Sequence, residues 1–178
     1  MKNIIPYIIF EKVAIKYIAY HGTKNEFEHF NYAYVGKGLD EYGPGFYFTN
    51  DYDEALKYGK VSKYELTIEK YIIKDKKPLR GEVSKLIRWA PEYKDTLTNF
   101  GQYEYEAMNT AIKSLTRDGY DKVDSYLSIC GDFYRKQGNS ALFVKNLVRL
   151  KYDAYIVREG DNTKYIMYNI DKIRKLND

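Results

Sequence analysis

The order in which strand-like and helix-like patterns follow one another limits the fold more than any other feature of this sequence. Residues 63–74 alternate apolar and polar side chains, mostly with a period of two, which is typical of a half-buried strand. Residues 81–150 instead have helical spacing, interrupted at prolines and glycines. Strand-like sequence returns at 152–157 and 164–170. We therefore predict an α+β fold in which the late strands pair with the early ones around a helical insertion at 81–150.

The chain length of 178 residues suits one domain with a single hydrophobic core. We predict one domain spanning 1–178, whose core is formed by 18–74 and 152–173. No apolar run approaches the roughly 20 residues that a membrane helix needs, and Pro6 interrupts the apolar patch near the start. We therefore expect no membrane partner and a cytoplasmic protein.

The counts of cysteine, histidine and charge exclude several classes of protein. One cysteine, Cys130, excludes a disulfide scaffold, and together with two histidines it makes a Cys/His zinc site implausible. We expect no metal. The formal charge of +4 is well below that of a dedicated nucleic-acid-binding protein. A basic stretch at 134–151 could touch phosphates, but its apolar residues at helical spacing favour the solvated face of helices.

Two short segments combine a strand with a glycine-rich turn. Residues 18–23 (IAYHGT) predict a strand that meets a turn, and FYFT (46–49) predicts a strand after a polar loop rich in glycine. Asp51 and Glu54 have the spacing of a capping box, and a glycine follows, so we predict a two-turn helix at 51–58. The chain also has 21 tyrosines, whose rings favour half-buried strands and can stack on planar ligands.

Four blocks of sequence, taken in order, resemble those of ADP-ribosyltransferases. They are YHGT (20–23), GPGFYFTN (43–50), EALKYG (54–59) and KYIMYNIDKI (164–173). Their order and spacing are similar to the diphtheria-toxin and poly(ADP-ribose) polymerase branch, which uses His, Tyr and Glu. The closest likeness is to the small transferase-like domains of phage and mobile-element polyvalent proteins, and it extends over about 18–173. The resemblance implies a split antiparallel β-sheet core with a helical insertion.

The resemblance also implies how the first block would bind NAD. His21 corresponds to the family histidine that orients the NAD ribose through a hydrogen bond. Gly22 corresponds to the residue whose backbone binds the nicotinamide carboxamide, and Thr23 would add a hydroxyl group nearby. NAD would be the substrate, and the family requires no metal.

The second and third blocks imply the walls of a nicotinamide site. By resemblance, Tyr47 and Tyr58 are the two rings that hold the planar, positively charged nicotinamide by stacking and cation–π attraction. Gly45 would let the backbone approach the pyrophosphate or turn tightly. Ala55 falls where some family members carry a serine that binds the carboxamide, so one hydrogen bond of the family site would be absent here.

The last block departs from the family pattern at the catalytic position. In transferases with the full triad a glutamate opens the last strand, where it stabilises the positive charge that develops on the ribose. Here Lys164 stands at that position, just before Tyr165. A fixed ammonium at about 4 Å would oppose a unit positive charge by roughly 4 kcal/mol at an effective dielectric constant of about 20. Such a penalty corresponds to roughly a thousandfold in rate.

Other acidic residues are candidates to replace the missing glutamate. Glu159 is the preferred one, because its loop at 158–163 adjoins the strand that should carry the catalytic group. That loop also corresponds to the family's target-recognition loop. The remaining candidates are Asp161, Glu104 and Glu106.

The leading interpretation is a mono-ADP-ribosyltransferase that releases nicotinamide and modifies a macromolecule, either protein or nucleic acid, as a toxin or phage effector would. One alternative is a catalytically silent binding module that lost turnover with the carboxylate, and another is an NAD glycohydrolase. An RNA 2′-phosphotransferase also uses a block like HGT, but we see no arginine motif in the later strands to hold an internal phosphate.

Overall fold

The computed structural model describes six segments of the chain: 13–38, 41–73, 80–90, 130–131, 134–135 and 138–177. The expectations for the apolar patch around Pro6, for most of the helical insertion, and for Glu104 and Glu106 lie outside the described residues.

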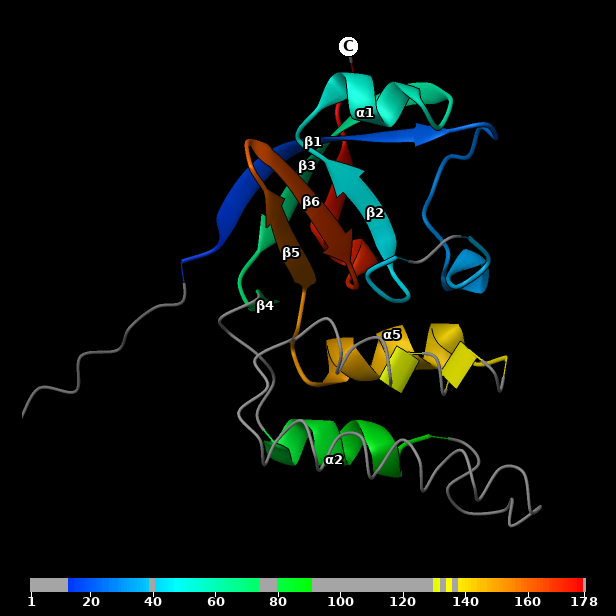
Figure 1. Ribbon diagram of the computed structural model, residues 1–178, viewed down its shortest axis with the longest axis vertical. Helices are drawn as coiled ribbons and strands as arrows, with labels where there is room; N and C mark the ends of the chain where they lie inside the picture. The colour runs from blue at the N-terminus through cyan, green and yellow to red at the C-terminus, as the bar shows by residue number, and fades with distance from the viewer. Residues whose placement is uncertain are drawn as a thin grey trace, which may run out of the picture.

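The described part of the chain forms one sheet with short helices beside it (Figure 1). The strands are β1 (Ile15–Thr23), β2 (Phe46–Thr49), β3 (Lys60–Ile68), β4 (Tyr71–Ile72), β5 (Ala154–Glu159), β6 (Asn162–Met167) and β7 (Ile173–Lys175). The helices are α1 (Tyr52–Leu56), α2 (Arg80–Arg88) and α5 (Ser140–Arg149), with 3-10 turns η1 (Tyr32–Tyr34) and η3 (Ile170–Lys172). The predicted α+β class is confirmed.

The late strands pair into the early sheet as the sequence predicts. The strand order is β4-β5-β6-β2-β1-β3-β7, so β6 lies inside the sheet, between β5 and β2. All described pairs are antiparallel except that of β4 with β5, which is parallel and makes the sheet mixed at this edge. Figure 1 shows α1 at one end of the sheet, with α2 and α5 near the other.

The sheet is split between β1 and β2. Whereas β1 pairs with β3 over nine residues, its register with β2 contains the single pair Tyr20 and Thr49. Beyond this pair the two strands diverge, and α1, which follows β2 directly, lies beside the gap. The expected split antiparallel core is therefore confirmed, and the split creates a recess at the ends of β1 and β2.

The strand predicted at 63–74 is interrupted after Ile68. The buried carboxylate of Asp153 accepts hydrogen bonds from the backbone N–H groups of Glu69 and Lys70, at 2.9 and 3.1 Å, and from the side-chain amide of Asn169 at 3.3 Å. These bonds hold a bend between β3 and β4. The sequence does not reveal this bend, because strand-forming residues stand on both sides of Glu69 and Lys70.

The loop expected at 158–163 is a tight hairpin turn. The register of β5 and β6 pairs Arg158 with Thr163 and Glu159 with Asn162, so only two residues connect the strands. One of them, Gly160, has a φ of +61°, which favours glycine. The polar residues on either side of this turn belong to the strands, because the hairpin pairs their backbone groups with each other. Only Gly160 and Asp161 lie outside the strands.

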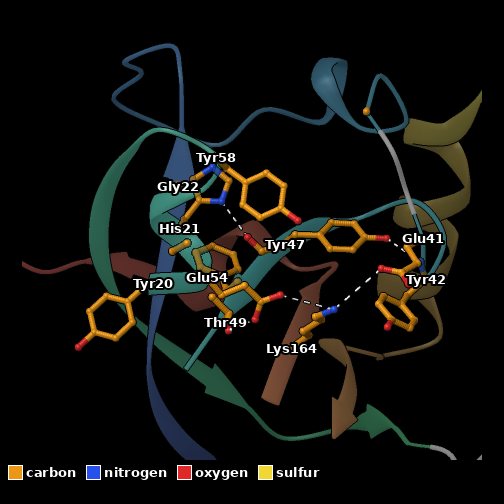
Figure 2. Close-up of a pocket in the computed structure, with 13 residues that line it drawn as sticks. Tyr20, His21, Gly22, Glu41, Tyr42, Tyr47, Thr49, Glu54, Tyr58 and Lys164 are labelled. Atoms are coloured by element: carbon orange, nitrogen blue, oxygen red, sulfur yellow. Dashed lines mark hydrogen bonds and ion pairs between the residues drawn. The ribbon is translucent and has the colours of Figure 1, made fainter. Parts of the chain in front are cut away.

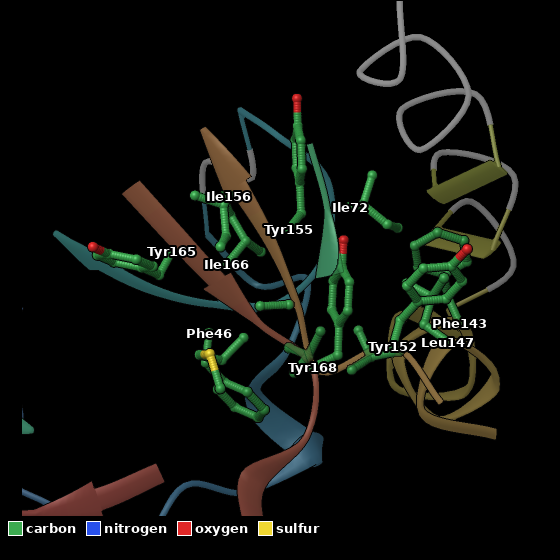
Figure 3. Packing of buried hydrophobic residues seen from close by; sticks show 14 of the residues in the cluster. Phe46, Ile72, Phe143, Leu147, Tyr152, Tyr155, Ile156, Tyr165, Ile166 and Tyr168 are labelled. Atoms are coloured by element: carbon green, nitrogen blue, oxygen red, sulfur yellow. The ribbon is translucent and has the colours of Figure 1, made fainter. Parts of the chain in front are cut away.

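The hydrophobic core lies between the sheet and α5 (Figure 3). Phe143 and Leu147 of α5 are almost fully buried with Ile166 and Met167 of β6. Several tyrosines also belong to this core, among them Tyr134, Tyr155 and Tyr168. This packing fixes β6 inside the sheet. None of the helices in the described segments is long and apolar enough to cross a membrane.

Candidate active site

A pocket of about 350 Å³ lies at the split between β1 and β2 (Figure 2). Its wall contains six of the residues singled out in the sequence: His21, Gly22, Tyr47, Ala55, Tyr58 and Lys164. Its size falls in the usual range for small-molecule sites. The four blocks of sequence thus converge on one recess, although more than 100 residues separate the first from the last.

His21 is held as a neutral hydrogen-bond acceptor. Its Nδ1 lies 2.8 Å from the carbonyl oxygen of Tyr47, and because a carbonyl can only accept, Nδ1 must carry the proton. In the neutral ring, which burial favours, the lone pair is then on Nε2. Aromatic rings surround the imidazole, with Phe30 and Phe48 at 5.3 and 5.4 Å between centroids. This burial lowers the pKa of His21, although the hydrogen bond to Tyr47 partly opposes the shift.

The two predicted stacking tyrosines differ in how tightly they are held. The hydroxyl of Tyr47 donates to the carbonyl of Gly43 at 2.7 Å and accepts from the N–H of Tyr42 at 3.0 Å. The loop before β2 therefore fixes this half-buried ring against the floor of the pocket. Tyr58, which follows α1, is 62% exposed and stands at the mouth. One ring is fixed by two hydrogen bonds, and the other is largely exposed to solvent.

Gly22 is required by the close approach of α1 to β1. A Cβ atom at this position would lie 1.8 Å from the carbonyl oxygen of Ala55 and 3.2 Å from the Cβ of Tyr58. Ala55 is itself buried at this contact. The small residues at 22 and 55 therefore let α1 lie directly against the strand and set the width of the pocket.

Thr23 and Gly45 are not part of this wall. Both line an adjoining pocket of about 540 Å³, which shares His21, Gly38 and Tyr47 with the first. The Thr23 hydroxyl donates to the carbonyl of Asn25 and so stabilises the turn after β1. A Cβ at Gly45 would lie 2.3 Å from a methyl group of Ile166, so this glycine is needed for packing against β6.

The Glu54 side chain does not complete the expected capping box and lies in the pocket wall instead. Asp51 caps α1 by accepting from the N–H groups of Asp53 and Glu54, at 2.8 and 3.1 Å. The reciprocal half of a capping box would join the Glu54 carboxylate to the N–H of Asp51, but that N–H donates to Thr49 Oγ1 at 3.1 Å. The Glu54 carboxylate instead lines the pocket, where its Oε2 accepts from Thr49 Oγ1 at 3.0 Å.

Lys164 lies opposite Thr49 on β6 and is surrounded by carboxylates. Its Nζ is 3.1 Å from Glu159 Oε2, 3.5 Å from Glu54 Oε1 and 3.9 Å from Glu41 Oε2. Burial disfavours the charge on Lys164, but its hydrogen bond with Glu159 and the neighbouring negative charges outweigh burial and raise its pKa. Figure 2 shows the ammonium between Glu54 and Glu41.

Glu159, the preferred substitute for the missing glutamate, is already engaged. One carboxylate oxygen accepts from the Tyr42 hydroxyl and the other faces Lys164. These two hydrogen bonds lower the pKa of Glu159, while burial and the bond to Glu159 raise that of Tyr42 to about 12. Asp161 lies in the hairpin turn, where its backbone carbonyl accepts from the Asn50 side chain.

Sequence reasoning missed Glu54 and Glu41 as members of this pocket. Glu54 matched a capping box, which is a complete local reason for a glutamate at that position. Glu41 lies in a glycine-rich loop whose course cannot be read from hydrophobic spacing. The available signal was a glutamate inside the third recognised block and another just before the second, together with a lysine that required a partner.

His21, Tyr47 and Tyr58 line one recess at the split of an α+β sheet, the arrangement that the resemblance to ADP-ribosyltransferases predicts. The family model described as "ADP-Ribosyltransferase in polyvalent proteins" matches residues 16–175, and the chain belongs to this family. The comparison with curated proteins gave no significant match. A solved structure described as "Crystal structure of an anti-CRISPR protein" covers 91% of this chain and 96% of its own, with 11% identity and a TM-score of 0.44. Similarity at that level says nothing about the function of this chain.

Proposed function

We propose that this protein is a mono-ADP-ribosyltransferase that cleaves NAD and transfers ADP-ribose to a macromolecular acceptor. The observation that carries the proposal is the convergence of His21, Tyr47 and Tyr58 on one pocket in a chain of this family. No group of His, Cys, Asp or Glu that could hold a metal is present among the described residues, and the proposed chemistry uses none.

The side chains around the pocket fit the parts of NAD. The nicotinamide ring is planar and positively charged, so the fixed ring of Tyr47 and the exposed ring of Tyr58 can bind its two faces. Nε2 of His21 carries a lone pair and can accept a hydrogen bond from a ribose hydroxyl. The adjoining pocket, which shares His21 and Tyr47, offers space for the rest of the dinucleotide.

The pocket can also favour cleavage of the bond to nicotinamide. Breaking this bond places positive charge on the ribose, and groups arranged around that charge stabilise the transition state more than the ground state. The three carboxylates near Lys164 outnumber its single positive charge. The ammonium is therefore not an isolated cation facing the ribose, which supports catalysis at this site in spite of the lysine.

We infer that the acceptor approaches over Tyr58 and the β5–β6 turn. Tyr58 is exposed at the mouth, and Glu159 at the end of β5 contacts Lys164 in the wall. The role as a cytoplasmic toxin or phage effector, which the sequence resemblance led us to expect, is part of the proposal.

The test is nicotinamide release from NAD by the purified protein, with and without a bacterial lysate, alongside NAD binding measured by calorimetry. His21→Ala provides the blank, and Ile18→Ala, an exposed position on the same strand, is its control outside both pockets. Release that depends on His21 and rises with lysate, with a label transferred to the acceptor, supports the transferase. Nicotinamide release that is the same with and without lysate identifies an NAD glycohydrolase. Binding without release identifies a silent binding module.

A further inference from the structure

We propose that Glu54 of α1 supplies the carboxylate that stabilises the positive charge on the ribose, in place of a glutamate on β6. The proposal rests on the transferase function given above. Its basis is the position of Glu54 in the wall of the same pocket as His21, Tyr47 and Tyr58. Lys164 has the role of a positioning residue, which holds the Glu54 carboxylate without touching the reacting atoms.

The arrangement places a carboxylate beside the site where β6 carries a lysine. Thr49 and Lys164 are opposite each other on β2 and β6, and Glu54 contacts both of them. Figure 2 shows the Glu54 and Lys164 side chains pointing toward each other across the floor of the pocket. A carboxylate can therefore reach this region from the helix, although the strand position itself is cationic.

Glu54 is better placed than the two other carboxylates. Its side chain is 17% exposed, compared with 47% for Glu159 and 68% for Glu41. Solvent screens an exposed charge, so the least exposed carboxylate has the strongest effect on a charge in the pocket. Glu159 uses one oxygen for Tyr42 and the other for Lys164.

The Glu54 carboxylate is held from two sides and keeps acceptor capacity. Thr49 Oγ1 donates to one oxygen at 3.0 Å and Lys164 Nζ lies 3.5 Å from the other. A carboxylate has about four acceptor positions, so two contacts leave others free for the substrate. Because Asp51 caps α1 without help from Glu54, the helix does not need this side chain for its own end.

The chemical step balances without any further reagent. The bond between the anomeric carbon and the nicotinamide nitrogen breaks, and its electron pair moves to that nitrogen, which neutralises the pyridinium ring. The anomeric carbon gains positive charge, which the Glu54 carboxylate stabilises electrostatically. A lone pair of the acceptor then forms the new bond to this carbon, and the proton of the acceptor passes to water at the open side of the pocket, where Tyr58 and Glu41 are exposed.

The test compares Glu54→Gln with Glu159→Gln and Glu41→Gln in the full chain. These substitutions are matched, because each removes one negative charge and keeps the shape of the side chain. We expect Glu54→Gln to lower the rate of nicotinamide release about 100-fold or more, as the loss of a transition-state contact does, while NAD affinity stays within about threefold. The two other variants should lose less than tenfold.

The positioning role of Lys164 has its own readout. Glu54→Lys alone should abolish release, and the reciprocal exchange of Glu54→Lys with Lys164→Glu should restore a measurable part of it, since the carboxylate then reaches the ribose from β6. A purely structural role for the ion pair predicts restored stability in the double variant with no restored release, and this outcome would overturn the assignment.

The outcomes separate this inference from the proposed function. If the wild type releases nicotinamide and Glu54→Gln loses less than about tenfold, as the two other variants should, only the role of Glu54 is overturned. If the wild type binds NAD and releases nothing, the transferase function fails and the role of Glu54 fails with it. Should Glu54→Gln lose its fold, Glu54→Asp keeps the charge on a shorter side chain, and a rate equal to that of the wild type would contradict the proposal.

Discussion

Replacement of Gly22 by alanine tests directly how α1 and β1 build the pocket. The added Cβ would lie 1.8 Å from the carbonyl oxygen of Ala55, whereas Cβ atoms essentially never approach other atoms closer than 3.0 Å. Relieving this contact moves α1 away from β1 by about 1.2 Å, the difference between the two distances. Because α1 carries Glu54 and leads to Tyr58, both side chains leave their places in the pocket wall.

The size of the effect follows from this displacement. A misplacement of about 1 Å in an active site costs on the order of 100-fold in rate. Overpacking of this kind costs about 1–3 kcal/mol in the free energy of unfolding, and the melting temperature of a chain this long falls by about 2–4 °C for each kcal/mol. Gly22→Ala should therefore show a large loss of nicotinamide release, weaker NAD binding and a melting temperature lower by several degrees.

Gly38→Ala is the matched control for this prediction. Gly38 also lines the pocket, but a Cβ there would meet no atom within 4 Å. The control should keep the rate of release, the NAD affinity and the melting temperature. Wild-type values for Gly22→Ala in all three measurements would refute the reasoning, and so would an equal loss in Gly38→Ala.

Three further predictions concern pH, ligand binding and stability. Burial lowers the pKa of His21 below the 6.5 of an unfolded chain, so its contribution to stability is full above pH 6.5 and declines as the pH falls. Thermal melts across pH 4–8 should therefore show a melting temperature that falls toward low pH, and His21→Gln should reduce this fall. Tyr58→Ala should weaken NAD binding about tenfold in calorimetry, whereas Tyr52→Ala, at the start of α1 and outside the pocket wall, should change it little. Asp153→Asn should lower the free energy of unfolding by about 2 kcal/mol in urea titrations, because two backbone N–H groups lose a charged acceptor.

Each of these three predictions has an outcome that contradicts it. Equal pH dependence in the wild type and His21→Gln would mean that another group titrates. Equal affinities in the two tyrosine variants would place NAD away from the mouth of the pocket. An unchanged midpoint for Asp153→Asn would show that the bend after β3 does not depend on the charge.

The larger elements of the fold could be predicted because their signals are local. Alternation identified β3, strand-like sequence at 164–170 identified β6, and helical spacing identified the segments that contain α2 and α5. The first strand was predicted at 18–23 but begins at Ile15, because pairing with β3 continues into residues whose own spacing is not strand-like. The bend after Ile68 was not predictable, since it depends on the carboxylate of Asp153, more than 80 residues later.

The candidate site could be predicted where it matches blocks of sequence and not where it depends on side-chain direction. His21, Tyr47 and Tyr58 converge as expected, although their roles toward NAD stay predictions. Lys164 was expected to oppose catalysis as a single positive charge. Its three acidic neighbours come from the loop before β2, from α1 and from β5, and only the folded chain brings them within 4 Å of one ammonium.

The position of β6 inside the sheet also has a consequence for synthesis on the ribosome. His21, Tyr47 and Tyr58 emerge early, but β2 lacks its β6 neighbour until residues after 162 have been made. At about 5–20 residues per second, the nascent chain would spend roughly 5–20 s with only half of the pocket. A chain with this strand order therefore cannot complete the wall of the pocket until most of the chain has been translated.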